Sequence, residues 1–338
     1  MKRTLEALVG ALALSMTGCA ANTPTLTTDV PSSPVPAADG KYDSVDDLIN
    51  PETIQTLKKT SYMVISESKY KNSEGKEIIL HSLGTAVVYK DIGSKTYLAT
   101  ADHLVQNEDV LFSLFKGKLE KVSEQFYLLE DDEVDMLHES LRELEQSKSK
   151  DAFFIEDSLG NRREPANYIV HTSSEIASIL SVLKPKKIAV VAQNETKDLA
   201  VISVPRLSHP QLPYSIGNAN ELQPQNLVFV IGYPRGLVEN ITRGFVTSEH
   251  DSKLARPDDR TRFIFDASIS PGNSGGGIFA VRDGKLELVG ITSAMYLGAN
   301  DLYIGAKING ISEVFKGNSI HCDKGWKCNL SALYKMNL

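Results

Sequence analysis

One short segment late in the chain combines a serine with several small residues. It runs from Pro271 to Gly277 with the sequence PGNSGGG, and Ser274 carries its only hydroxyl. Glycines allow the backbone to turn so that N–H groups converge beside this hydroxyl, and we expect the amides of Gly272 and Ser274 to be the two donors. Such donors stabilise the oxyanion formed when a hydroxyl attacks a carbonyl carbon. An ordinary tight turn also uses glycines, so the segment alone leaves both interpretations open.

A serine hydroxyl becomes a nucleophile when a neighbouring base takes its proton, and histidine has a suitable pKa near neutral pH. The chain contains seven histidines. Only His103 directly follows an apolar run that predicts a strand, in TYLATADHLV, whereas His138 lies in a predicted helix and the others have polar or turn-like neighbours. A strand end would hold His103 at a rigid edge. Taken singly, such a histidine more often serves structure than catalysis.

The third residue of such a site is a carboxylate that orients the imidazole and stabilises its protonated form. Asp198 precedes the apolar run of KDLAVISV, which places its side chain at the entrance of a predicted strand. Asp102 is the alternative, but adjacent side chains of an extended segment point to opposite faces, away from one another. With Asp198 chosen, the chain order is His103, Asp198, Ser274. This is the order of chymotrypsin, and it differs from those of subtilisin and the α/β-hydrolases.

Short strands predominate among the elements that must position these residues. Between turn signals, apolar or β-branched runs recur from about residue 60 onward, which indicates an all-β sandwich or barrel. The runs are AVVY (86–89), TYLATA (96–101), IAVVA (188–192), LAVISV (199–204), LVFVIG (227–232), RFIFDA (262–267), GIFAV (277–281), LELVGITSAM (286–295) and LYIGAKI (302–308).

One region departs from the strand pattern. Between about 129 and 147, apolar residues recur at spacings of three and four, namely Val134, Leu137, Leu141 and Leu144. This spacing predicts an amphipathic helix, and its acidic start suits the positive end of a helix dipole. We expect the helix to pack on the barrel or cover its rim, with partner binding as the alternative.

These motifs together resemble the trypsin-like serine proteases, and most closely the bacterial HtrA (Deg) group. The resemblance spans about 84 to 310 and rests on GTAVV with TADHLV, KDLAVISV, VIGYPRGLVENITRGFVTS, and DASISPGNSGGGIF with GITSA. It implies a chymotrypsin-like double β-barrel with His103, Asp198 and Ser274 as a catalytic triad, polypeptide substrates, and no metal or other cofactor. HtrA relatives are often trimers, so a homo-oligomer is compatible with it. A non-catalytic binding or scaffold protein is the alternative function, but such a protein has no physical need to retain all three side chains.

The chain also departs from the HtrA pattern. Only about thirty residues follow Ile308, so we expect no peptide-binding PDZ domain. The gap between His103 and Asp198 is long for the family, and we expect an insertion at about 106–187 that contains the predicted helix. Asn273 stands where digestive trypsin-like enzymes have an aspartate, so activation by an ion pair with a new amino terminus is not expected.

By the same resemblance, Ser268, Ser293 and Gly305 would line the specificity pocket. None of them is acidic, so we expect a small or medium apolar side chain in the pocket and no preference for Lys or Arg. Lys307, near the pocket strand, leaves a preference for acidic residues open.

The amino terminus has the layout of an export signal. Lys2 and Arg3 precede a short apolar run at 7–14, and MTGC ends at Cys19. Because the run is too short to span a bilayer as a helix, we expect a signal peptide at 1–18. Gly18 before Cys19 resembles a lipobox, which implies an exported protein held by lipid in the bacterial cell envelope, on its periplasmic or surface side. An ordinary signal, cleaved or retained, is the alternative.

Composition bounds the remaining segments. With 41% hydrophobic and 23% charged residues the chain predicts a globular domain, and its net charge of −7 argues against nucleic acid as the main partner. We expect a flexible tether at 19–50, a protease domain at 51–316 and a tail at 317–338. In an oxidising compartment Cys322 and Cys328 would form a small disulfide loop. A metal site beside them is the alternative, but nothing else suggests four converging ligands.

Overall fold

The computed structural model describes residues 39–43, 51–72, 75, 77–105, 119–147, 155–156, 162–163, 173–236, 239–250, 260–295 and 301–315. The predicted signal peptide, the predicted lipidation site Cys19 and the predicted disulfide between Cys322 and Cys328 lie outside these residues. In the described part of the chain, no helix has both the length and the hydropathy that crossing a membrane requires.

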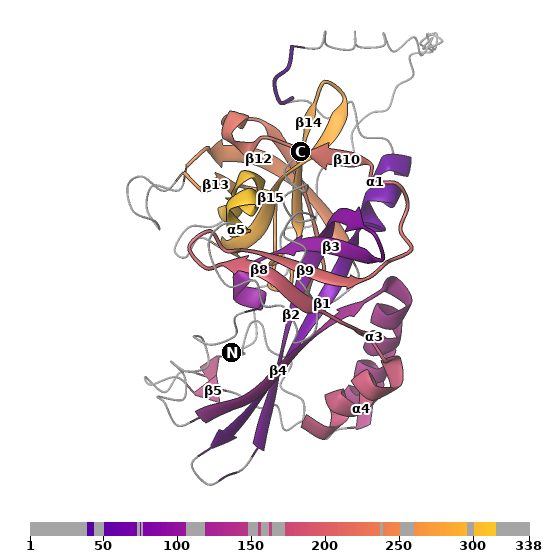
Figure 1. The fold of residues 1–338 in the computed structure, drawn as a ribbon. Helices are drawn as coiled ribbons and strands as arrows, with labels where there is room; N and C mark the ends of the chain where they lie inside the picture. Colours follow the sequence, from indigo (N-terminus) through magenta and orange to yellow (C-terminus); the bar gives the residue numbers. More distant parts are fainter. Residues whose placement is uncertain are drawn as a thin grey trace, which may run out of the picture. The chain divides into compact units, whose positions relative to one another are not determined.

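The first sheet contains seven strands in the spatial order β7-β4-β1-β2-β3-β9-β8 (Figure 1). They are β1 (Ser61–Asn72), β2 (Glu77–Ile92), β3 (Lys95–Thr100), β4 (Leu119–Leu129), β7 (Lys186–Lys187), β8 (Ala189–Asn194) and β9 (Leu199–Pro205). Neighbouring strands are antiparallel. Because side chains alternate between the faces of a strand, β9 contributes to two cores. Ala200 and Ile202 enter the core of this sheet, whereas Leu199 and Val201 enter a core shared with the second sheet.

The second sheet also has seven strands, in the order β10-β15-β14-β11-β12-β13-β16. They are β10 (Tyr214–Ile216), β11 (Leu227–Gly232), β12 (Asn240–Ser248), β13 (Arg262–Phe265), β14 (Gly277–Arg282), β15 (Lys285–Met295) and β16 (Tyr303–Lys307). Since β15 also pairs with β16, the strands from β15 to β16 close into a six-stranded barrel. Aromatic side chains fill part of its interior, where the ring centroids of Phe265 and Tyr303 lie 5.8 Å apart.

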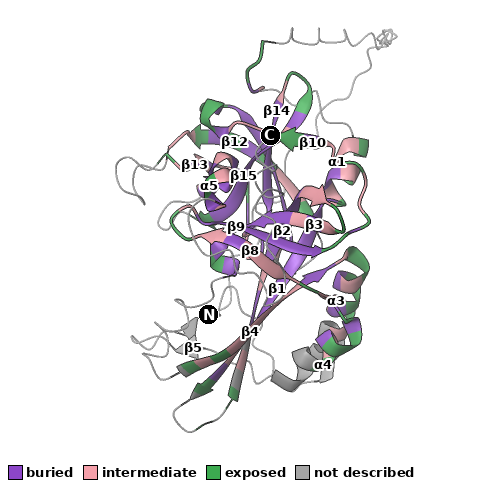
Figure 2. Cartoon of the chain, viewed as in Figure 1, coloured by how far each residue is buried: buried purple, intermediate pink, exposed green. Residues whose placement is uncertain are grey.

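A third core joins the two sheets. It includes Leu199 and Val201 of β9 with Ile231 of β11 and Phe279 of β14. The Tyr214 ring packs 4.8 Å from that of Phe279, centroid to centroid, and its hydroxyl donates to Val88 O in the first sheet. In Figure 2 strands such as β9 and β15 are largely buried, whereas α1 (Pro51–Lys58) and α3 (Asp131–Ser147) carry exposed residues. The expected all-β, chymotrypsin-like double barrel is confirmed.

Two helices of the described chain lie between His103 and Asp198 in the sequence, within the expected insertion. They are α3 and α4 (Ser173–Leu183), and α3 confirms the helix expected at 129–147. Its first turn is acidic, as a helix dipole favours. Buried side chains of α3 and α4 pack together with those of β1 and β4, and with one tyrosine from after β11: Met63, Ile65, Leu129, Val134, Leu137, Leu180, Leu183 and Tyr233. We call this group the insertion core.

Short elements complete the described fold. They are β5 (Ile155–Glu156), β6 (Arg162–Arg163), α5 (Ile311–Val314) and the 3-10 turns η1 (Asp102–Leu104), η2 (Ala219–Glu221), η3 (Pro234–Gly236) and η4 (Ile308–Gly310). Of these, η1 follows β3 directly and η3 follows β11, and both contribute to the contacts described below.

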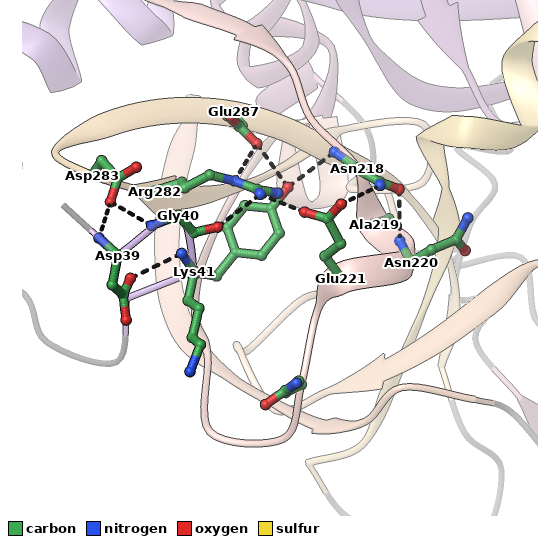
Figure 3. A network of polar contacts seen from close by, with 12 residues as sticks. Asp39, Gly40, Lys41, Asn218, Ala219, Asn220, Glu221, Arg282, Asp283 and Glu287 are labelled. Carbon is green, nitrogen blue, oxygen red and sulfur yellow. Dashed lines mark hydrogen bonds and ion pairs between the residues drawn. The ribbon is translucent and has the colours of Figure 1, made fainter.

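Residues 39–43 lie against the second sheet, although we expected them to belong to a flexible tether. Tyr42 is only 5% exposed, and its hydroxyl donates to Glu287 Oε2 at 2.7 Å. The Arg282 guanidinium lies 4.0 Å from the centroid of the Tyr42 ring, and Asp283 accepts hydrogen bonds from two backbone amides of the segment (Figure 3). For these residues the expectation is wrong, because an aromatic side chain that fills a core overcomes the entropy cost of ordering its neighbours.

Candidate active site

His103 and Asp198 are in contact, although 95 positions separate them in the chain. Strands β3 and β9 pair antiparallel, with Thr100 opposite Ala200, so the segment leaving β3 meets the segment entering β9. His103 Nδ1 lies 2.9 Å from Asp198 Oδ1 and 3.0 Å from Oδ2, and the backbone N–H of His103 donates to Oδ1 at 3.0 Å. An ionised carboxylate only accepts, so Nδ1 carries the proton and Nε2 is left as the basic nitrogen of the neutral ring.

The electrostatics of this pair favour opposite charges on its members. Burial raises the pKa of Asp198, but the hydrogen bonds from His103 and Ser293 outweigh it, and the pKa falls below its ordinary value. Burial lowers the pKa of His103, but the hydrogen bond and charge of Asp198 outweigh it, and the pKa rises. The His103 side chain is 46% exposed, against 11% for Asp198, so the imidazole remains accessible from solvent.

Ser274 is half-buried, in a turn that packs against the end of β3. Its carbonyl accepts from the Thr85 N–H of β2 at 2.8 Å, and the next residue, Gly275, donates to Thr292 O at 2.8 Å. Gly275 has a φ of +83°, and a Cβ there would stand 2.0 Å from Thr85 O and 2.9 Å from Leu104 Cδ1. Only glycine fits, and the turn thereby reaches the neighbour of His103. Among the hydrogen bonds of the described residues, none joins the Ser274 hydroxyl to His103.

The backbone beside Ser274 offers two N–H groups that could bind an anion. Gly272 has a φ of +100°, and its carbonyl accepts from the Thr85 hydroxyl at 2.8 Å. The intervening amide, Asn273 N–H, donates to Ser270 O at 3.0 Å. Within the described residues, the N–H groups of Gly272 and Ser274 have no protein acceptor. Buried N–H groups are nearly always paired, so these two unpaired groups are candidates for binding a ligand oxygen.

One protein-family model matches this chain over the region that contains the candidate site. The model of the trypsin-like peptidase domain matches residues 84–291, more than half of the chain, and this range includes His103, Asp198 and Ser274. The chain belongs to the trypsin-like peptidase family.

Curated proteins similar to this trypsin-like peptidase are named as serine proteases. The putative serine protease HhoB of Synechocystis sp. is 35% identical over 125 residues, which cover 36% of this chain and 28% of HhoB. A probable periplasmic serine endoprotease, DegP-like, of Chlamydia pneumoniae is 31% identical over 140 residues, which cover 41% of this chain and 27% of the relative. The matched region thus spans little more than a quarter of either relative.

Solved structures give similar chains at lower identity. The HtrA-type protease AlgW with a decapeptide has a TM-score of 0.47 and 14% identity, over 78% of this chain and 65% of AlgW. The serine endoprotease from Yersinia pestis has a TM-score of 0.44 and 16% identity, over 78% of this chain and 64% of that one.

The residues expected to line the specificity pocket of this trypsin-like peptidase have three different surroundings. Ser268 is exposed. Ser293 is buried, and its hydroxyl donates to Asp198 Oδ2, so it supports the carboxylate. Gly305 faces the core of the second barrel, because a Cβ there would stand 2.7 Å from both Phe263 Cζ and Ile278 Cδ1. Of the described residues, no group of three or more His, Cys, Asp or Glu side chains could hold a metal ion.

Three residues near the site make contacts that the sequence did not predict. Thr85 contacts the turn that carries Ser274, and Ser293 contacts Asp198. Asp102, which we considered only as a rival to Asp198, is 1% exposed, and the backbone of Asn194 donates a hydrogen bond to it. The available signal was a hydroxyl or carboxyl inside an otherwise apolar run, in GTAVV, GITSA and TYLATAD. Buried polar groups of this kind need partners, but the run does not say which.

Proposed function

We propose that this trypsin-like peptidase is a serine endopeptidase. The observation that carries the proposal is the 2.9 Å contact between His103 Nδ1 and Asp198 Oδ1, which leaves Nε2 as the basic nitrogen of an imidazole that is accessible from solvent. Family membership and the names of the relatives support the same activity. The unpaired N–H groups beside Ser274 suit the transition state of acyl transfer.

Each residue of the site has a role in this reaction. Ser274 Oγ attacks the carbonyl carbon of a peptide bond while His103 Nε2 takes its proton, and the carbonyl oxygen becomes an oxyanion bound by the amides of Gly272 and Ser274. Asp198 keeps the proton on Nδ1 and stabilises the imidazolium that forms. His103 then gives the proton to the leaving amine, and water releases the acyl group from Ser274 by the same route.

For the setting, we propose the bacterial cell envelope, with exported or misfolded proteins as substrates. Support comes from the export signal predicted at 1–18 and from relatives whose names place them in the periplasm. Cys19 would carry the lipid that holds the protein on a membrane, and the partners would be polypeptides and further copies of the chain.

A fluorophosphonate probe tests the activity, because it reacts with a serine hydroxyl only when that serine is an activated nucleophile. We expect the folded, mature protein to be labelled at Ser274, and Ser274→Ala to remove the label. Peptide-library cleavage by the wild type would then define the residue preferred in the specificity pocket. If the mature protein takes no label, with or without a candidate activator, the enzyme proposal is refuted and the scaffold alternative replaces it.

A further inference from the structure

We propose that Thr85 and Tyr233 are positioning residues that hold the turn at 271–276 ready to bind an oxyanion, and that α3 of the insertion fixes this arrangement through Tyr233. The proposal rests on the proposed function, since it gives the insertion a part in that same site. It names a physical link between a helical segment outside the two barrels and the backbone beside Ser274.

Thr85 holds the turn at two points. Its backbone N–H donates to Ser274 O and its hydroxyl donates to Gly272 O, each at 2.8 Å. Its own carbonyl accepts from the Thr100 hydroxyl at 2.7 Å, which fixes Thr85 to β3. The two carbonyls that Thr85 binds belong to the peptide units before and after the one that carries the Ser274 amide, and only one Cα separates Gly272 O from the Gly272 amide. The contacts of Thr85 therefore restrict the backbone torsions that aim these two amides. Gly272, at φ +100°, has a broad range of backbone conformations, and an external contact is needed to select one.

Tyr233 determines where the Thr85 hydroxyl points. The backbone N–H of Tyr233 donates to Thr85 Oγ1 at 3.1 Å. A hydroxyl has one proton to donate, and since Tyr233 occupies a lone pair, that proton is directed to Gly272 O. The preceding residue, Gly232, lies directly against the same turn, because a Cβ there would stand 3.0 Å from Asn273 Cα. A shift of the Tyr233 backbone would therefore reach the turn by two routes.

The side chain of Tyr233 belongs to the insertion core. It is 1% exposed and packs with Val134 and Leu137 of α3. Its hydroxyl donates to Asp131 Oδ1, in the first turn of α3, at 2.9 Å and lies 3.4 Å from Ser61 O. The docked helix thus holds Tyr233 by packing and by a hydrogen bond to a carboxylate, a stronger class of hydrogen bond than one between neutral groups.

A second bond ties α3 to the same loop. His138 Nε2 donates to the carbonyl of Gly236, in η3. The loop from Tyr233 to Gly236 is therefore held at both ends by one helix, and its first residue controls Thr85. If α3 leaves this position, the loop loses both contacts, and the turn beside Ser274 loses the partner that orients the Thr85 hydroxyl.

Kinetics of three variants test the link in the mature protein, with a quenched fluorescent peptide that the wild type cleaves. Thr85→Val keeps the shape but removes the hydroxyl, and we expect kcat to fall about 10- to 100-fold with KM changed less than about threefold. Thr85→Ser restores the hydroxyl and should return kcat to within about threefold of the wild type. Tyr233→Phe removes only the hydroxyl, with its bond to Asp131 and its longer contact with Ser61 O, and we expect a fall in kcat of about 3- to 10-fold.

A tetrahedral inhibitor separates positioning of the amides from general destabilisation. A peptide boronic acid forms an adduct on Ser274 that needs the oxyanion donors, so its inhibition constant should rise in parallel with the loss of kcat. Because ground-state binding does not use these donors, Thr85→Val should not change the affinity for the uncleaved peptide. The comparison is made without cleavage, between Ser274→Ala and the double variant Ser274→Ala/Thr85→Val, and the two should bind the peptide equally well.

Matched controls remove similar hydrogen bonds elsewhere. Like Thr85, the Thr96 hydroxyl makes two hydrogen bonds: it donates to Asp91 and accepts from the backbone N–H of Leu207. Like Tyr233, Tyr214 has a buried hydroxyl that donates one hydrogen bond, here to a backbone carbonyl. Thr96→Val and Tyr214→Phe should lower the thermal midpoint while leaving kcat of the folded protein within about twofold of the wild type.

The outcomes distinguish the two proposals. If the wild type cleaves the peptide and folded Thr85→Val and Tyr233→Phe match its kcat, the positioning role is refuted and the endopeptidase proposal stands. The positioning role is also refuted if variants with a reduced kcat keep the wild-type inhibition constant for the boronic acid. A wild type that neither cleaves nor takes the fluorophosphonate label overturns both. If Thr85→Val fails to fold, the comparison of kcat between Tyr233→Phe and Tyr214→Phe is decisive. Equal kcat values in these two variants would refute the link.

Discussion

Replacing Asp102 by asparagine should make the protein more stable, and only above acidic pH. Burial and then the charge of Asp198 raise the pKa of the Asp102 carboxyl from 3.8 to about 7. Each pKa unit corresponds to about 1.4 kcal/mol, so a rise of about 3 makes ionisation in the folded protein cost about 4 kcal/mol. The asparagine side chain would not be charged, yet its oxygen could still accept the hydrogen bond from the backbone of Asn194.

The sign of the effect follows from proton binding. A carboxyl whose pKa is raised by folding binds its proton more tightly in the folded than in the unfolded state, so its contribution to stability decreases as pH rises from about 4 to about 7. The Asp102→Asn variant has no carboxyl at this position, so its stability does not decrease with pH for this reason. We expect the two proteins to be similar near pH 4 and the variant to be more stable by about 2 to 4 kcal/mol at pH 8, the lower value allowing for relaxation around the charge.

The charges around Asp102 also affect catalysis. Asp198, Glu195 and His103 act on its carboxyl, and Arg262 acts on His103. The charge of Asp102 raises the pKa of His103, so Asp102→Asn should lower the apparent pKa on the acid side of the pH profile of kcat/KM.

Urea unfolding at pH 4, 5, 6, 7 and 8 would measure the stability of the wild type and the variant. Comparing the two at each pH cancels the opposite contribution of Asp198, which both retain. Asp135→Asn, which removes the same charge from the exposed surface of α3, serves as the matched control and should show no pH-dependent difference. A stability difference for Asp102→Asn that stays constant across this pH range would refute the reasoning.

Four further predictions concern single sites. Ser293→Ala removes the hydroxyl that donates to Asp198, and we expect kcat to fall about 10-fold with KM unchanged; an unaltered kcat in steady-state kinetics would contradict the role. Gly275→Ala brings a Cβ to 2.0 Å from a backbone oxygen at φ +83°, so we expect a loss of more than about 3 kcal/mol in urea unfolding, and wild-type stability would disprove the packing. Tyr42→Ala empties part of the second barrel and should cost about 3 to 5 kcal/mol, whereas a change below about 1 kcal/mol would show that residues 39–43 do not hold the sheet. Cys19→Ser should abolish palmitate incorporation and release the protein from membranes in a flotation assay; incorporation that persists would remove the lipid-anchor proposal.

The sequence by itself determined the class of the fold and the identity of the candidate catalytic residues. Apolar runs predicted strands because successive side chains of a strand point to opposite faces. The spacing of three and four at 129–147 predicted α3 because residues at that spacing lie on one face of a helix. The contact of His103 with Asp198 could be expected because each lies where a strand run begins or ends, and such ends meet when the strands pair. Local patterns of this kind are fixed by neighbouring residues.

Only the tertiary structure decided the contacts between distant segments. Nothing in GTAVV or GYPRG indicated that Thr85 and Tyr233 meet beside the turn of Ser274, because a hydroxyl or an amide inside a run has no periodic signature of its partner. The packing of Tyr42 and the burial of Asp102 were missed for a related reason. Composition and spacing describe a residue's neighbours in the chain, whereas burial and pKa depend on which other strands and loops pack over it.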